Sequence, residues 1–106
     1  DHVKGLIKSM QHRNAVLGAG LFIEPAWVML LELYLAHLEK VRISVSSLCV
    51  SSGATHATAL RRIDDLTKLG LVVRKNDESD KRRANIFLTT EGVEKISRLL
   101  PEIFKT

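Results

Sequence analysis

The feature that most constrains the fold is a short helical segment, a glycine turn and a longer helical segment, which follow one another over about residues 46–69. The short segment is apolar, and we expect Ser46 or Ser47 to cap its start. Gly53 suits the left-handed conformation of a helix C-terminus or a tight turn. Thr55 is a favoured N-cap for the next helix. This order of elements predicts a helix-turn-helix motif.

The longer helix is amphipathic and stops at Gly70. Its inward stripe is expected to consist of Ala59, Leu60, Ile63, Leu66 and Thr67. With about 3.6 residues per turn, the opposite face holds Thr58, Arg61, Asp65 and Lys68, with Arg62 on the flank. A short, polar and basic face of this kind can enter a DNA major groove, where an arginine can donate two hydrogen bonds to a guanine edge.

A hairpin with a charged tip is expected directly after this helix. Residues 71–75 are predicted to form a strand, residues 76–81 a polar turn and residues 83–88 a returning strand. Half of the 16 lysine and arginine residues lie on the helix and hairpin, namely Arg61, Arg62, Lys68, Arg74, Lys75, Lys81, Arg82 and Arg83. This concentration of basic charge favours a polyanionic partner such as nucleic acid.

Further helices are expected at the centre and at both ends of the chain. A helix from Pro25 to about Lys40 is apolar around most of its circumference, as a helix buried at the centre of a domain would be. Residues 41–45 alternate with a period of two and are rich in β-branched side chains, which predicts a short strand. Terminal helices are predicted over about residues 2–17 and 90–104.

The last of these helices has two candidate caps and one internal proline. We expect Thr89 or Thr90 to cap its start, and Pro101 to kink or restart it. The fold class is therefore mainly α with a small antiparallel β-wing, a winged helix-turn-helix domain flanked by terminal helices. The 106 residues suffice for one such domain, 1–106, and not for two.

The composition limits the remaining classes of function. Hydrophobic residues make up 45% and charged residues 26% of the chain, as in ordinary globular proteins, and the net charge of +4 is mildly basic. The single cysteine, Cys49, leaves no internal disulfide and no Cys/Cys metal spacing, which fits a cytoplasmic location. The apolar stretch 26–38 is shorter than the ~20 residues that a membrane span needs. We expect no membrane association, no metal and no cofactor.

Several motifs together carry a resemblance to a known family. They are Leu48-Cys49 through Gly53-Ala54-Thr55, Gly70-Leu71-Val72, Asp80-Lys81-Arg82-Arg83 and Leu88-Thr89-Thr90-Glu91-Gly92. Over about residues 46–92 this succession resembles the MarR-type winged-helix regulators. Asp80 and Arg82 match the Asp-x-Arg wing motif of that family. The resemblance implies that the arginine reaches the minor groove, where negative potential is concentrated, and that the aspartate helps to hold the wing.

The resemblance, together with the basic helix and hairpin, implies a sequence-specific double-stranded DNA-binding transcriptional regulator, a repressor by expectation. It also implies a homodimer through the terminal helices and a small aromatic effector. The alternative is a winged-helix protein–protein interaction module without a specific DNA site. The expected DNA-binding residues are Thr55, His56, Ala57, Thr58, Arg61, Arg62, Lys75, Asp80, Arg82 and Arg83.

A few residues have a structural explanation beside a functional one. A buried structural thiol is favoured over a redox switch at Cys49. His56 falls nearer the inward stripe than the exposed face, so packing competes with a DNA contact. Trp27 and Tyr34 could line an effector pocket, but core packing is favoured. The adjacent carboxylates of residues 64–65 diverge by about 100° on a helix and have no nucleophile or base beside them, so no enzyme is expected.

Overall fold

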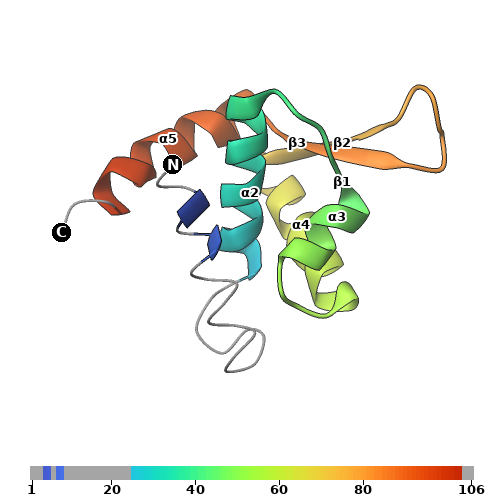
Figure 1. Cartoon of the computed structure of the whole chain (residues 1–106), viewed down its shortest axis with the longest axis horizontal. Helices are drawn as coiled ribbons and strands as arrows, with labels where there is room; N and C mark the ends of the chain where they lie inside the picture. The colour runs from blue at the N-terminus through green and yellow to red at the C-terminus, as the bar shows by residue number, and fades with distance from the viewer. Residues whose placement is uncertain (1–3, 6, 9–24, 104–106) are drawn as a thin grey trace.

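The structure, a computed structural model, describes residues 4–5, 7–8 and 25–103. After helical residues at 4–5 and 7–8, the elements are α2 (Pro25–Glu39), β1 (Ile43–Ser44), α3 (Val45–Ser51), α4 (His56–Lys68), β2 (Val72–Asn76), β3 (Ala84–Leu88) and α5 (Thr90–Ile103). The strands form one antiparallel sheet in the order β1-β3-β2. Figure 1 shows the β2–β3 hairpin projecting from the helical body as a wing. The predicted winged helix-turn-helix fold is confirmed. Most of the helix predicted over 2–17 lies outside the described residues.

Helix α2 is the centre of the domain. It packs against α3, α4, α5 and β3, and Val28, Met29 and Leu31 on it have no exposed surface. A helix that is covered on several sides has to be apolar on several sides, as its sequence is. Trp27 and Tyr34 are partly buried and pack against the same core, as the core interpretation predicts.

The start of α3 differs from the prediction. Ser44 is the N-cap, because its side chain accepts a hydrogen bond from the backbone N–H of Ser47 at 3.1 Å. The expectation of a cap at Ser46 or Ser47 is wrong, and the strand expected over 41–45 is reduced to Ile43–Ser44. The cause is the pairing of β1 with β3, which holds Ser44 in an extended conformation and lets the chain pass directly from strand to helix.

The turn between α3 and α4 is formed as predicted. Gly53 has a φ of 76°, in the left-handed region that favours glycine. Buried Ser52 fixes the turn from the α3 side, because its hydroxyl donates to the Cys49 carbonyl at 2.6 Å and accepts from the Ala54 N–H at 3.2 Å. Thr55 caps α4 as expected, accepting from the Thr58 N–H at 3.2 Å.

The buried side of α4 is narrower than predicted. Ala59, Ile63 and Leu66 are buried, and Leu60 packs against the core. Thr67, expected on the inward stripe, is exposed, and its hydroxyl donates to the Ile63 carbonyl at 2.8 Å. A threonine can satisfy its hydroxyl within its own helix in this way, so it needs no place in the core.

Helix α5 begins against the corner between α4 and β2. Its capping residue is Thr89, whose hydroxyl donates to the Gly70 carbonyl at 2.7 Å and accepts from the Gly92 N–H at 3.0 Å. A Cβ atom on Gly92 would lie 2.3 Å from the Leu71 carbonyl oxygen. The close approach of α5 to this corner therefore requires glycine. The helix continues through Pro101 to Ile103 without a restart.

Replacing Gly92 with alanine should destabilise the fold. The new methyl group would collide with backbone at Leu71 rather than with a movable side chain, and overpacking of this kind costs about 1–3 kcal/mol of unfolding free energy. Gly5→Ala is the matched control, since no atom of the described residues lies within 4 Å of the position of its Cβ. Urea denaturation should show a lower midpoint for Gly92→Ala only. Equal midpoints for the two variants would contradict the close contact.

Candidate nucleic-acid interface

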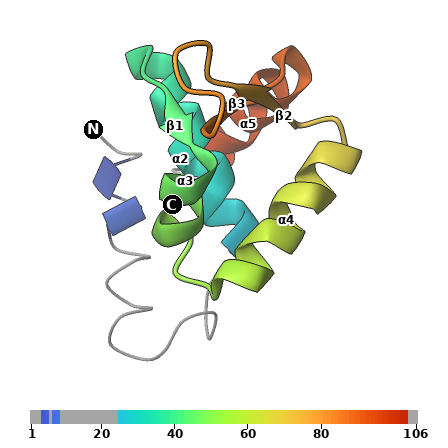
Figure 2. The same ribbon diagram turned by 90° about the vertical axis from the view of Figure 1, so that its right-hand side faces the viewer.

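The wing and helix α4 face the same side of the molecule. Figure 2, which looks onto that side, shows α4 below and beside the tip of the hairpin, with α3 next to both. The two elements that carry most of the expected DNA contacts are therefore presented together. A nucleic acid lying across this side could touch a helix and a β-hairpin at once.

The N-terminal turn of α4 is open to solvent. Thr55, His56 and Ala57 are exposed, whereas Thr58 is partly buried and accepts a hydrogen bond from the Thr55 hydroxyl at 3.0 Å. The expectation that His56 lies nearer the inward stripe is wrong, because it is the first residue of α4 and projects beyond the packed part of the helix. Packing no longer competes with a ligand contact at His56.

The two arginines of α4 differ in their surroundings. Arg61 is exposed on the outer face. Arg62 is partly buried on the flank, with its Nε 3.1 Å from Oδ2 of Asp65, three residues further along the helix. Arg61 therefore presents its guanidinium to solvent, while that of Arg62 is held along the helix surface.

At the wing tip, Asp80 holds two arginines. Its Oδ1 accepts from the backbone N–H of Arg82 at 3.1 Å and from the Nε of the same residue at 3.2 Å. Its Oδ2 lies 3.7 Å from Nε of Arg83. The Arg82 side chain is still 92% exposed. The carboxylate thus holds the guanidinium through its Nε and leaves the terminal nitrogens at the surface, an arrangement that suits a contact made outside the protein.

The residue that organises the wing tip, Asp77, was not among the predicted site residues. Its Oδ1 accepts from the Ser79 N–H at 2.9 Å, the Ser79 hydroxyl at 2.6 Å and the Asp80 N–H at 3.3 Å. Its Oδ2 accepts from Nδ2 of Asn85, on the opposite arm of the hairpin, at 3.3 Å. The hydrogen bonds, that from the Ser79 hydroxyl first, lower the pKa of Asp77 to about 2. The Asp-x-Ser spacing, which is typical of an Asx turn, was the available signal.

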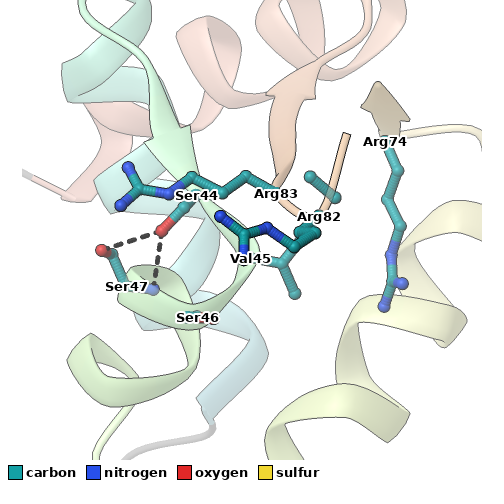
Figure 3. Close-up of a pocket in the computed structure, with 8 residues that line it drawn as sticks. Ser44, Val45, Ser46, Ser47, Arg74, Arg82 and Arg83 are labelled. Atoms are coloured by element: carbon teal, nitrogen blue, oxygen red, sulfur yellow. Dashed lines mark hydrogen bonds between the residues drawn. The ribbon is translucent and has the colours of Figure 1, made fainter. Parts of the chain in front are cut away.

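A cleft separates the wing from the start of α3. It has a volume of about 450 Å³ and is lined by Ser44, Val45, Ser46, Ser47, Arg74, Arg82, Arg83 and Ala84. Figure 3 shows Arg82 and Arg83 extending toward the Ser44 end of α3, with Arg74 on the other side. Three guanidinium groups therefore border one hollow lined with hydroxyl groups. Asp80 pairs with two of them, so positive charge remains in excess at this part of the surface.

Lys75 lies apart from this cleft. Successive side chains of a strand point to opposite faces, so Lys75 and Arg74 diverge. The Nζ of Lys75 lies 5.8 Å from the centroid of the Phe87 ring, in a second depression that Arg42, Asp77 and Glu78 also line. The sequence singled out Lys75 as a site residue and missed Arg74, which is the β2 residue on the side of Arg82 and Arg83.

Other kinds of site find little support in the described residues. Cys49 is only 3% exposed, and burial raises the pKa of its thiol. Such a thiol forms the reactive thiolate poorly, so the structural interpretation holds.

Within residues 4–5, 7–8 and 25–103, no three His, Cys, Asp or Glu side chains are grouped so that they could hold a metal ion. The helices of this part of the chain include none with the length and apolarity of a membrane span.

Comparison with known proteins matches this chain to a family model and to transcriptional repressors. A model of the MarR family matches residues 23–83. The HTH-type transcriptional repressor YetL of Bacillus subtilis is 38% identical over 63 residues, which cover 59% of this chain and 38% of YetL. The transcriptional repressor MprA of Escherichia coli is 30% identical over 94 residues, covering 89% of this chain and 52% of MprA. The chain thus spans about half or less of the length of these relatives.

The fold also matches solved structures. The crystal structure of an S. aureus MepR–DNA complex superposes with a TM-score of 0.65 at 18% identity, covering 94% of this chain and 69% of that one. This likeness is one of fold. Together with the family model, which matches more than half of the sequence, it agrees with the winged-helix fold. The chain belongs to the MarR family, a family of transcriptional regulators.

Proposed function

We propose that this chain binds double-stranded DNA sequence-specifically, with α4 in the major groove and the wing in the minor groove, and acts as a transcriptional repressor. The observation that carries the proposal is the exposure of Arg61 on α4 and Arg82 on the wing tip, on elements that face one side of the molecule (Figure 2). Occupation of a promoter would exclude the transcription machinery. The curated relatives YetL and MprA are repressors by name, which supports this role.

The contacts divide by chemistry. Arg61, exposed on α4, suits base edges in the major groove, and Arg82 suits the narrow minor groove. The hydroxyl and backbone N–H groups at the start of α4 suit phosphate oxygens, which position a protein on the duplex without reading its sequence. The proposed DNA-binding residues remain Thr55, His56, Ala57, Thr58, Arg61, Arg62, Lys75, Asp80, Arg82 and Arg83. To these we add Arg74, because it lines the same cleft as Arg82 and Arg83.

Assembly and regulation form a further part of the proposal. A homodimer through the terminal helices would place two wings and two α4 helices on a palindromic site. Leu99 on α5 is 49% exposed, and an apolar side chain on the outer side of a terminal helix suits such an interface. The proposal also includes a small aromatic effector. It treats residues 1–106 as a single domain and places the protein in the cytoplasm. The proposal includes no enzymatic activity, in keeping with a family of transcriptional regulators.

The alternative, a protein–protein interaction module, has less support. Such a module would use an apolar face, as protein interfaces concentrate aromatic and aliphatic residues at their centres. The outer face of α4 instead carries Arg61, Asp64, Asp65 and Lys68. The polar face and the arginines of the wing favour DNA as the partner.

Replacing Arg82 with alanine should weaken binding to a selected duplex more than binding to random duplex. Loss of one sequence-reading arginine costs about 1–3 kcal/mol of binding free energy. Lys95→Gln is the control for net charge, because Lys95 pairs with Glu91 on α5, away from the wing. Fluorescence anisotropy with a duplex selected from a random pool gives both affinities. Equal losses on the two duplexes, or equal effects of the two variants, would contradict a selective role for Arg82.

Salt should weaken the wild-type complex steeply. Each phosphate contact releases counterions, so the logarithm of the association constant should fall linearly with the logarithm of the salt concentration. The double variant Arg61→Ala/Arg82→Ala should lose selective binding and keep its circular dichroism spectrum, since both side chains are exposed. Binding that is absent or insensitive to salt, from folded wild-type chain, would favour the interaction module instead.

A further inference from the structure

We infer that Asp77 is a positioning residue for DNA recognition, which fixes the wing tip so that Arg82 is presented in one orientation. This inference rests on the proposed function and assigns a specific role within it to a residue that would not itself touch DNA. Asp77 is only partly exposed, and the acceptor oxygens of its carboxylate are already engaged by groups of the wing.

The Asp77 carboxylate joins both arms of the hairpin. One oxygen receives the Ser79 and Asp80 donors within the tip, and the other receives Nδ2 of Asn85 from β3. The backbone N–H of Asp77 donates to the Arg83 carbonyl at 2.9 Å, which closes the loop at its base. A hairpin tip held only by its backbone would retain several conformations, whereas these side-chain bonds select one.

The hydrogen bonds lead directly from Asp77 to the arginine. Asp77 accepts from the Asp80 N–H, and the Asp80 carboxylate accepts from both the backbone N–H and the Nε of Arg82. Without the Asp77 carboxylate, the backbone N–H of Asp80 would lose its hydrogen bond. The Arg82 side chain, which Asp80 holds, would then adopt a wider range of orientations. Binding would then have to order the tip at a cost in free energy, as with any recognition loop that is not preorganised.

Asn85 anchors the arrangement to the rigid part of the molecule. It is 8% exposed and lies in β3, paired with Ser44 of β1 and Lys75 of β2. A buried amide is expensive to leave unpaired, so its bond to Asp77 holds the tip against the sheet. Arg42 and Lys75 line the depression beside Asp77, as does the acidic Glu78, and Asp80 lies within the tip. Its hydrogen bonds lower the pKa of Asp77 to about 2, so the carboxylate is ionised at neutral pH and both of its oxygens can accept.

A double-mutant cycle tests the inference. Binding to the selected duplex is measured for wild type, Asp77→Ala, Arg82→Ala and the double variant. If Asp77 acts through Arg82, Asp77→Ala weakens binding by about 5-fold or more when Arg82 is present. In the chain that already carries Arg82→Ala, the same replacement causes no further loss of affinity. Additive losses, or no loss in Asp77→Ala, would overturn the inference. A wild-type chain that binds no duplex would instead refute the proposed function itself.

Conservative replacement separates positioning from stability. Asp77→Asn keeps an oxygen for the Ser79 and Asp80 donors, and its amide can donate to the oxygen of a rotated Asn85 side chain, so binding should return to within about threefold of wild type. Glu78→Ala, at an exposed carboxylate on the same tip, controls for charge and should bind at least as well as wild type. Failure of Asp77→Asn to restore binding would count against positioning.

Thermal unfolding is measured for each variant to establish that it is folded. Should Asp77→Ala fail to fold, Asn85→Ala takes its place in the cycle, since it removes the bond between the tip and β3 and leaves Asp77 itself unchanged. The same non-additivity with Arg82→Ala is then expected. Additivity in that cycle overturns the inference in the same way.

Discussion

The burial of α2 is the constraint on which the rest of the structure depends. Because α2 is apolar around most of its circumference, α3, α4, α5 and β3 can all pack against it, and each presents its other side to solvent. The inner face of α4 is apolar because it packs against α2, and the outer face is polar because it is in contact with water. The position of the candidate interface is thus a consequence of core packing, while its chemistry comes from side chains that the core does not need.

Turns and helix caps fix the positions at which the packed helices begin and end, and so determine which residues lie at the surface. Gly53, Ser52 and Thr55 set where α4 begins, and Thr89 and Gly92 lock α5 against the corner that follows α4. The wing, by contrast, leaves the body of the molecule and has no core of its own. Its order depends on hydrogen bonds of the Asp77 carboxylate and on the pairing of Asp80 with Arg82 (Figure 3 shows the arginines at its edge).

Local signals in the sequence predicted the features that are determined locally. Gly53, Thr55 and Gly70 mark the ends of helices through backbone conformation and capping, and Asp80 and Arg82 are only two positions apart. Features that depend on partners distant in the sequence were not predicted. The cap at Ser44 follows from pairing of β1 with β3, and the bond between Asp77 and Asn85 follows from the hairpin register. That Arg74 and not Lys75 lines the cleft depends on which face of the hairpin lies beside α3.

The most direct test is hydrogen–deuterium exchange of the chain with and without a selected duplex. We predict that the duplex slows exchange at the start of α4, residues 56–62, and at the wing tip, residues 77–83, while exchange on α5 within residues 94–99 changes little. Protection of these two segments together would support a helix and a wing bound to one DNA site. Protection confined to α5, or none at the wing tip in a saturated complex, would contradict it.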